Sequence, residues 1–508
     1  MHNAKFDLKF IKHHLGIDVE GIFDSMLTSI LIEAGVPKPR GWHGLGDVAY
    51  RYTKTRLNKD LQVSDWSANE LSRAQIAYAE KDAEVLPAIR ESMVERLKKM
   101  GLVRCAKLEF DTVLPTAYME LCGFYLDLPQ WSKVAEAEFA RSEILSQEIL
   151  EELQPVIEQQ SLFGLAEINL DSQVQVQKYF RKLGIPMPDS TKESYLEALK
   201  GEYPIVGKLL EYRGCKKSST SFGDSFAKFV NPKTGRIHAD YRQIGAEKTG
   251  RFSVNNPNLQ QIPHDADHRN CFKAEQGNMI GSCDYSQQEL RILADFSKDK
   301  AFIDLFLAGQ DFHTATAAQV FKIPIEKVSP DERTFAKKLN FGLVYGIGVQ
   351  RFAESVGIEQ TEAQIIMSNY FRTFSSVDRW LRAQKQNVLR TFQSRTASGR
   401  LARYEVDMDD RGSIAKAQRN AANMPIQGTG ADMTKRALRL FYDEVIKGRE
   451  HLIKLVNVVH DEINIEAPEN IIEDVTEQLR ECMIKAGADF VNAVPIKVDK
   501  KITAIWSK

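Results

Sequence analysis

Asn278-Met-Ile-Gly-Ser-Cys-Asp-Tyr-Ser-Gln-Gln-Glu-Leu-Arg-Ile-Leu-Ala-Asp-Phe-Ser297 is the stretch that decides the fold, because an apolar strand ends in it and a helix begins. Residues 279–283 are typical of a buried strand, whereas apolar residues recur at helical spacing over 290–296. Asp284 stands where the two patterns meet, so we expect its carboxylate at a strand end that faces a cleft. A lone Asp at such a junction more often caps the following helix, so a chemical role requires a partner.

The candidate partner lies far downstream, where β-rich residues surround His460-Asp461-Glu462. Two strands joined across this tripeptide predict a hairpin with adjacent carboxylates at its turn, which is unfavourable in a dry site unless a cation offsets the repulsion. On neighbouring strands, Asp284 and Asp461 could hold two Mg²⁺ ions roughly 3.5–4 Å apart, the arrangement that stabilises both attacking and leaving oxygens in phosphoryl transfer. Oxygen ligands suit Mg²⁺, which also keeps waters and substrate phosphates in its shell.

A third segment decides between this chemistry and a pair of surface acids. Arg333, Lys337, Phe341 and Tyr345 follow one another at steps of four, so they share one helix face. Two cations followed by two aromatic rings can hold a triphosphate and then stack a base and sugar. Neither a solvated charge stripe nor a core stripe explains this combination, because core packing alone favours aliphatic side chains.

The three segments resemble motifs A, B and C of the family A DNA polymerases, the bacterial DNA polymerase I type. They read Asp284-Tyr-Ser-Gln-Gln-Glu-Leu-Arg291, Arg333-x3-Lys337-x3-Phe341-Gly-x2-Tyr345-Gly346 and His460-Asp461-Glu462. Three motifs in this order and at this wide spacing carry far less risk of a chance match than one short motif does. The similarity runs from about residue 1 to the C-terminus. One departure is Gln288, where the family usually has an aliphatic residue.

The resemblance implies an α+β fold, a right-hand polymerase of palm, fingers and thumb preceded by a partial ribonuclease H-like 3′–5′ exonuclease domain. The expected boundaries are 1–95 for the exonuclease-like domain, 96–240 for the thumb, 241–297 for the palm with motif A, 298–400 for the fingers with motif B, and 401–508 for the returning palm with motif C. Residues 1–95 alternate strand-like and helical patterns. Residues 96–240 predict helices over 102–119 and 131–153, with a short extended element at 121–127.

Composition narrows the class of protein. At 508 residues the chain is long enough for two or three domains, and its 43% hydrophobic content is ordinary for a soluble enzyme. The net charge of -1 means that a nucleic-acid site must come from local clustering, and Lys and Arg outnumber Asp and Glu in residues 201–260. The six cysteines lack metal-ligand spacing, and no apolar run approaches the roughly 18 residues needed to span a membrane. Residues 1–20 have no signal-peptide pattern, so we expect a protein of the cytoplasm of a bacterium or a phage-infected cell. We also expect a monomer.

The N-terminal region resembles two of the three exonuclease motifs. Asn3 and Asp7 match the second motif, and Tyr78 and Asp82 match the third. The first motif, an Asp-x-Glu on a preceding strand, is absent because the chain begins too late, and Asp18-Val-Glu20 has the spelling but the wrong place. We therefore expect a vestigial fragment without intrinsic proofreading.

The resemblance also implies a role for each site residue. Asp284 and Asp461, with the Tyr285 carbonyl, would bind two Mg²⁺ ions, and Glu462 would support them near the primer terminus. The nucleotide site would contain Arg333, Lys337, His313, Phe341, Tyr345, Glu289 and Gln287, with Lys337 also protonating the pyrophosphate. The DNA contacts would come from Arg251, Arg419, Asn423, Gln427, His460 and Arg269, with Arg213, Lys216 and Lys217 on thumb phosphates.

The predicted function is template-directed DNA synthesis, in which a primer 3′-hydroxyl attacks a dNTP on primer-template DNA and pyrophosphate leaves. Two other classes stay open. A non-catalytic DNA-binding remnant is suggested by the broken exonuclease half, although intact motifs A, B and C argue against it. A two-metal nuclease would need the Asp-x-Glu that is lacking and has no use for motif B.

Overall fold

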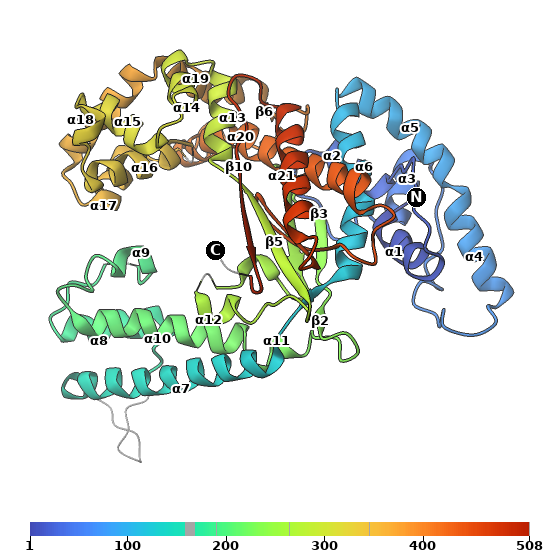
Figure 1. Ribbon diagram of the computed structural model, residues 1–508, viewed down its shortest axis with the longest axis horizontal. Coiled ribbons are helices and arrows are strands. Elements are labelled where there is room, and N and C mark those ends of the chain that lie inside the picture. Colours follow the sequence, from blue (N-terminus) through green and yellow to red (C-terminus); the bar gives the residue numbers. More distant parts are fainter. Residues whose placement is uncertain (158–167, 189, 264, 345, 507–508) are drawn as a thin grey trace. The chain divides into compact units, whose positions relative to one another are not determined.

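A computed structural model describes residues 1–157, 168–188, 190–263, 265–344 and 346–506 of the chain (Figure 1). The chain divides into two compact units. The first comprises Met1–Gly123, Ala239–Asn255 and Gly277–Ile502, and the second comprises Phe124–His238, Asn256–Gln276 and Thr503–Lys508. Both combine helices with strands, as the predicted α+β class requires. Among the described helices, none combines the length and the apolar character that crossing a bilayer requires.

The centre of the first unit is a four-stranded sheet in the order β10-β5-β9-β8. Its strands are β5 (Asn278–Tyr285), β8 (Lys454–Val459), β9 (Glu462–Pro468) and β10 (Val498–Thr503). Strand β9 runs antiparallel to both β5 and β8, and Asp284 lies directly opposite Glu462. A two-residue turn, His460-Asp461, joins β8 to β9, and His460 has the positive φ (57°) that tight hairpins use at their first turn position. The predicted strand and hairpin are confirmed.

Two helices are closely associated with β5 of this sheet. α13 (Gln288–Ser297) follows β5 as predicted, and α21 (Ile472–Ala488) packs on β5. An ideal Cβ on Gly281 would lie 2.2 Å from Thr476 Oγ1, so α21 approaches the strand closely because residue 281 has no side chain. A second hairpin is formed by β3 (Asp240–Ala246) and β4 (Arg251–Asn255). The Tyr241 hydroxyl of β3 donates to Asn457 Oδ1 of β8 at 2.7 Å, and this bond joins the hairpin to the sheet.

Further helices of the first unit lie before β5 in the chain or between β5 and β8. They are α6 (Val103–Cys122), α14 (Lys300–Leu307), α15 (Phe312–Phe321), α16 (Pro330–Val344), α17 (Val349–Val356), α18 (Gln360–Thr373), α19 (Ser375–Thr391) and α20 (Arg411–Phe441), with the short hairpin β6 (Gln393–Arg395) and β7 (Leu401–Arg403). Buried aromatic rings join the helices between α14 and α19: Phe302 lies 5.1 Å from both Phe312 and Phe374, measured between ring centroids. This aromatic core holds α15 beside α16, the helix of motif B.

Residues 1–98 are all described and form no strand, so the predicted alternation of strands and helices is wrong there. The region consists of α1 (Ala4–Leu15), α2 (Ser25–Glu33), α3 (Leu45–Thr53), α4 (Arg73–Glu84) and α5 (Leu86–Lys99). The apolar run of α2 looks strand-like, but the Asp24 side chain accepts hydrogen bonds from the amides of Met26 and Leu27 and starts a helix. Ser72 and Gln75 form a capping box that starts α4 in the same way.

The second unit is mainly helical. α7 (Leu128–Leu153) and α10 (Pro204–Ser221) lie side by side, with α8 (Gln173–Lys182), α9 (Glu193–Leu196), α11 (Asp224–Ala227), α12 (Ala266–Arg269) and the strand pair β1 (Phe124–Tyr125) and β2 (Arg236–Ile237) (Figure 1). Apolar residues of α7, among them Leu145 and Ile149, pack against Val206 and Leu209 of α10. α7, together with α6 of the first unit, confirms the two helices predicted from periodicity over 131–153 and 102–119.

Candidate active site

One cavity of about 360 Å³ brings the three predicted motifs together. It is lined by Arg251, Asp284, Tyr285, Gln287, Gln288, Glu289, Phe341, Gly430, Ala431, His460 and Asp461. These residues come from β4, β5, α13, α16, α20 and the β8–β9 turn, which are widely separated in the chain. Of the eleven, eight are predicted site residues; Gln288, Gly430 and Ala431 are additions that only the fold reveals.

The acidic side chains of the cavity lie where burial and neighbouring negative charges disfavour the ionised carboxylate. Asp461 has its pKa raised to about 6, first by burial and then by the nearby charges of Glu289 and Glu462, while Arg251 acts in the opposite direction. Asp284 is half-buried at the end of β5, opposite Glu462. Carboxylates crowded in this way favour a cation among them.

The donor set fits Mg²⁺. Asp284 and Asp461 offer carboxylate oxygens beside the backbone of Tyr285, and these are the hard ligands that Mg²⁺ prefers. Within the described ranges, no three side chains of His, Cys, Asp or Glu converge as a closed metal cage. A site with two protein carboxylates leaves coordination positions for water and substrate phosphates, as Mg²⁺ sites in phosphoryl-transfer enzymes do.

Arg251 and Glu289 form an ion pair inside the cavity. Arg251 Nη2 donates to Glu289 Oε1 at 2.7 Å, and the Glu289 side chain is 12% exposed. The sequence places one residue before motif A and the other within it, and no local pattern indicates that they meet. The pair links β4 to the first turn of α13, which also carries Gln287 as its N-cap.

Gln288 connects α13, the helix of motif A, to α20. Its Nε2 donates to the Gly430 carbonyl at 3.3 Å, and an ideal Cβ on Gly430 would lie 2.4 Å from Gln288 Oε1. The amide therefore fits against α20 only because residue 430 is a glycine. This contact gives the unusual Gln288 of motif A a structural reason.

The predicted nucleotide-binding face of motif B lies on α16. Of its described residues, Phe341 lines the cavity, whereas Lys337 is exposed. Arg333 forms a two-pronged ion pair with Asp311, at 3.0 Å from Nε to Oδ1 and 2.9 Å from Nη2 to Oδ2, which lowers the pKa of Asp311. Tyr345 lies outside the described residues.

His313 is buried beside this helix. Its ring centroid lies 5.6 Å from that of Phe341, and its Nδ1 lies 3.2 Å from Asn340 Nδ2. Burial lowers the pKa of His313 to about 4, so the ring is neutral at neutral pH. Any contact with phosphate in this state is a hydrogen bond and not charge neutralisation.

Helix α20 carries the three predicted DNA-facing residues at steps of four. Asp410 caps the helix, accepting from the amides of Gly412 and Ser413, and Arg419, Asn423 and Gln427 follow along it. Arg419 is exposed, whereas Asn423 and Gln427 are half-buried. Gln427 precedes by one turn the Gly430 and Ala431 that line the cavity.

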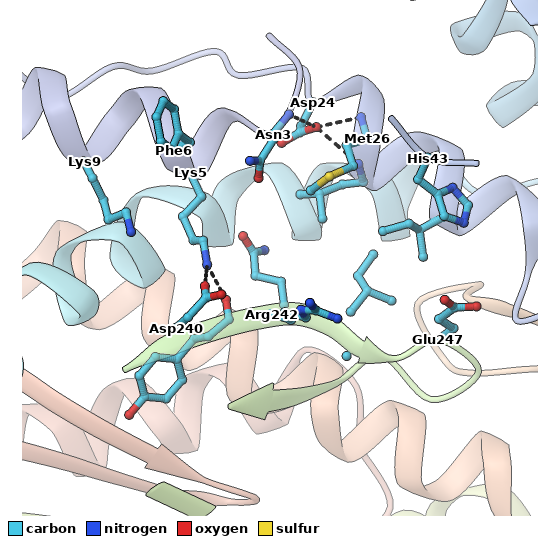
Figure 2. Close-up of a pocket in the computed structure, with 16 residues that line it drawn as sticks. Asn3, Lys5, Phe6, Lys9, Asp24, Met26, His43, Asp240, Arg242 and Glu247 are labelled. Carbon is cyan, nitrogen blue, oxygen red and sulfur yellow. Dashed lines mark hydrogen bonds and ion pairs between the residues drawn. The ribbon is translucent and has the colours of Figure 1, made fainter. Parts of the chain in front are cut away.

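The four exonuclease-like residues are not gathered into one site. Asn3 lines a second cavity, of about 530 Å³, where Lys5 bridges to Asp240 at 2.7 Å (Figure 2). The pKa of Asp7 is raised by burial and by Asp24, whereas Asp82 interacts with Tyr78 and Lys59. Asp18 and Glu20, the misplaced Asp-x-Glu, bond to the Tyr442 hydroxyl and to Lys447, which agrees with a structural role.

Two arginines of the second unit are placed differently from the predicted DNA contacts. Arg269 is 2% exposed, and its guanidinium lies 4.4 Å from the ring centroid of Trp506. Arg213 donates to the carbonyls of Thr191 and Leu170, at 2.7 and 3.3 Å. Both guanidinium groups have contacts inside the second unit, which a basic residue in a basic region does not indicate by itself. The predicted DNA contacts of Arg269 and Arg213 stay predictions.

Comparison with known proteins agrees with this geometry. The family model described as DNA polymerase family A matches residues 140–508, and one described as 3′–5′ exonuclease matches residues 1–98. DNA polymerase I of Aquifex aeolicus is 32% identical, with 100% of this chain and 87% of the relative covered. DNA polymerase I of Pseudomonas aeruginosa is 30% identical, and the thermostable DNA polymerase I of Thermus thermophilus is 32% identical.

The chain spans 56% and 57% of those last two curated relatives, little more than half their length. Among solved structures, the POL domain of Pol1 from M. smegmatis, in complex with DNA primer-template and dNTP, matches with a TM-score of 0.84 at 26% identity. That match covers 99% of this chain and 85% of the solved one. These matches show that the chain belongs to DNA polymerase family A, a family of DNA-directed DNA polymerases.

Proposed function

We propose that this chain extends a primer on a DNA template by transferring nucleotides from dNTPs to the primer 3′-hydroxyl, with release of pyrophosphate. The observation that carries the proposal is the single cavity shared by Asp284, Asp461, Phe341 and Arg251. It combines paired carboxylates for phosphoryl transfer with an aromatic ring for the nucleotide and a cation for the DNA. The solved relative is a complex with DNA primer-template and dNTP, which supports this choice of substrates.

Asp284 and Asp461, with the Tyr285 carbonyl, would hold two Mg²⁺ ions in this cavity. When bound, the ions would lower the pKa of the primer hydroxyl and stabilise the charge that develops on the attacking and leaving oxygens. The carboxylates need to be ionised for this, and the raised pKa of Asp461 makes its ionisation depend on pH near 6. Glu462 would support the acids from its place opposite Asp284.

The side chains of α15 and α16 would bind and orient the triphosphate. Lys337, exposed on the helix that presents Phe341, would contact it and donate a proton to the departing pyrophosphate. Arg333 would exchange the carboxylate of Asp311 for phosphate oxygens, which offer its guanidinium the same two-pronged geometry. His313 would add a hydrogen bond, and Tyr345 and Gln287 would complete the nucleotide site.

Arg251 and Gln427 would test the shape of the newest base pairs from the minor groove. Acceptors occupy similar positions there in all pairs, so a donor can sense pair geometry without choosing a base. Arg419, Asn423 and His460 would contact the template strand and primer. Glu289 would exclude ribonucleotides, since its carboxylate lies in the cavity, held by Arg251.

The rest of the chain follows from this assignment. We assign residues 96–240 to the thumb, 241–297 and 401–508 to the palm, and 298–400 to the fingers. Residues 1–95 would be structural without proofreading, because Asp7 lies near Asp24 whereas Asp82 interacts with Tyr78 and Lys59, so the two expected metal ligands have different neighbours. The chain would work as a monomer in the cytoplasm of a bacterium or a phage-infected cell, a proposal supported by its bacterial relatives.

Primer extension with Mg²⁺ and four dNTPs tests the proposal. Wild type should extend the primer, whereas Asp284→Ala and Asp461→Ala should bind primer-template without extending it. Asp443→Ala, which removes an exposed acid that is paired with Arg439 and does not line the cavity, serves as the matched control and should extend normally. DNA binding without extension by wild type would identify a non-catalytic remnant, and primer shortening would identify a nuclease.

A further inference from the structure

Four charged side chains form a closed cluster in the first unit, outside the cavity lining. The buried quartet consists of Glu109 of α6, Arg400 just before β7, and Asp432 and Lys435 of α20. Each of these side chains is at most 1% exposed. Arg400 donates to Glu109 and also, from Nε and Nη2, to Asp432 Oδ1 at 3.1 and 2.6 Å. Lys435 Nζ lies 2.5 Å from Glu109 Oε1.

The quartet is electrically balanced, with two cations and two anions. Burial alone would raise the pKa of Glu109, but Lys435 and Arg400 more than offset this, so its pKa lies below the ordinary value and the group stays charged. A buried ionic cluster of this kind is weak evidence for stability, because well-packed apolar residues can serve as well. What it offers in addition is directional contact with its neighbours.

Those contacts reach the β3–β4 hairpin on both sides of Arg251. An ideal Cβ on Gly250, which has a φ of +74°, would lie 2.3 Å from Arg400 Cζ, so the backbone before Arg251 rests directly on the guanidinium. Lys435 Nζ lies 5.4 Å from the ring centroid of Phe252, the residue after Arg251. In the partner strand, Gln243 Nε2 donates to the carbonyl and to Oε2 of Glu109, at 2.9 and 3.2 Å.

The same cluster fixes α20 next to Gln427. Asp432 Oδ2 accepts from the hydroxyls of Thr396 and Ser398, at 2.9 and 2.6 Å, which docks the β6–β7 turn on the helix. An ideal Cβ on Gly428 would lie 2.4 Å from Thr396 Cγ2. Arg251 and Gln427 lie on different elements. The quartet contacts Gly250 and Phe252, the chain neighbours of Arg251, and reaches Gly428, the neighbour of Gln427, through Thr396.

We propose that the buried quartet positions Arg251 and Gln427 as a pair, so that its geometry determines how strongly the rate of synthesis depends on the shape of the newest base pair. None of its members lines the cavity, so Glu109, Arg400, Asp432 and Lys435 are positioning residues. The inference rests on the proposed function, in which Arg251 donates to a minor-groove acceptor. Rigid placement matters because a hydrogen bond weakens steeply with misalignment.

The test removes one hydrogen-bond acceptor from the DNA and measures how much the extension rate of each variant falls. Two primer-templates differ only at the primer 3′ end, where guanine is replaced by 3-deazaguanine, which lacks the N3 acceptor of the minor groove. We expect wild type to extend the deaza primer roughly tenfold more slowly, the effect of one lost hydrogen bond to a charged group. Arg251→Ala should extend both primers at the same reduced rate.

The decisive variant is Arg400→Lys, which keeps the charge but loses the fork that reaches Glu109 and Asp432 together. It should still extend the primer with Mg²⁺, but its ratio of rates on the two primers should fall towards that of Arg251→Ala. Arg436→Lys is the matched control, because this half-exposed arginine of α20 pairs with Asp489 at 2.8 Å, outside the quartet. It should keep the wild-type ratio.

Each outcome is informative. If wild type extends both primers equally, the minor-groove role of Arg251 fails. If wild type discriminates and Arg400→Lys discriminates equally, the positioning inference is overturned while the proposed function stands. Should thermal melting show that Arg400→Lys is unfolded, Gln243→Leu replaces it, since this change removes only the hairpin's bonds to Glu109; an unchanged ratio there overturns the inference too.

Discussion

Arg251 Nη2 and Glu289 Oε1 lie 2.7 Å apart inside the candidate active site, so the residue proposed to test base-pair shape holds the residue proposed to exclude ribonucleotides. Replacing either therefore changes the position of the other.

Glu289→Ala should raise ribonucleotide incorporation relative to dNTP by about tenfold or more, because a 2′-hydroxyl is the feature that tells the two sugars apart and its space would open. Competition between rNTP and dNTP on one primed template measures the ratio. Arg251→Ala is the control, since it releases the carboxylate without removing it and should change the ratio less. An unaltered ratio in Glu289→Ala would count against the steric role.

Phe341→Tyr should remove most of the discrimination against dideoxynucleotides. A dNTP brings a 3′-hydroxyl that can contact its own β-phosphate, and a Tyr hydroxyl could take that place when the sugar lacks it. One hydrogen bond to a charged group is worth about 1.5–3 kcal/mol, which corresponds to roughly ten- to over a hundredfold in relative incorporation. Competing ddNTP against dNTP gives the ratio directly; equal ratios in the two proteins would show that Phe341 does not face the sugar.

Extension activity should rise with pH through about 6, because Asp461, with its pKa raised to about 6, binds metal only when ionised. Raising the Mg²⁺ concentration should move the midpoint to lower pH, since the cation competes with the proton. Rates at several Mg²⁺ concentrations between pH 5 and pH 8 provide the measurement. A midpoint that ignores Mg²⁺ would assign the titration to another group.

The same shift has a consequence for stability. A carboxyl whose folded pKa exceeds its unfolded value favours the folded state below the unfolded pKa and loses that contribution as pH rises through the folded pKa. Without Mg²⁺, Asp461→Asn should therefore be more stable than wild type at pH 8, on the order of 2 kcal/mol, and the difference should vanish near pH 4. Thermal melts of both proteins at the two pH values, with added chelator, check this; a larger difference at pH 4 would reverse the assigned sign.

The chain alone should not shorten a mismatched primer. Asp7 has Asp24 near it, whereas Asp82 interacts with Tyr78 and Lys59, so the two acids expected to share a metal pair have different neighbours. A labelled, mismatched primer incubated with Mg²⁺ and no dNTP tests the expectation. Metal-dependent shortening that Asp82→Ala abolishes would contradict it.

Local pattern was enough to predict the elements that carry the site. The strand that ends near Asp284, the hairpin around Asp461 and the helix that bears Lys337 and Phe341 all follow from periodicity within about fifteen residues. The family resemblance added the expectation that these segments meet, which the shared cavity agrees with. Short-range spacing failed in residues 1–98, where side-chain caps such as Asp24 turned a β-rich run into a helix.

Tertiary structure alone decided which charges pair with which. The pairing of Arg251 with Glu289, the bond from Gln288 to Gly430 and the Arg400 cluster join residues far apart in the chain, and sequence spacing carries no information about such contacts. Burial likewise distinguishes Arg269, which lies over the Trp506 ring, from the exposed Arg419, because an arginine has the same local sequence signature in both settings. Sequence determined which elements form and which chemistry they carry, whereas packing determined which side chains remain available for that chemistry, since availability depends on every neighbour the fold supplies.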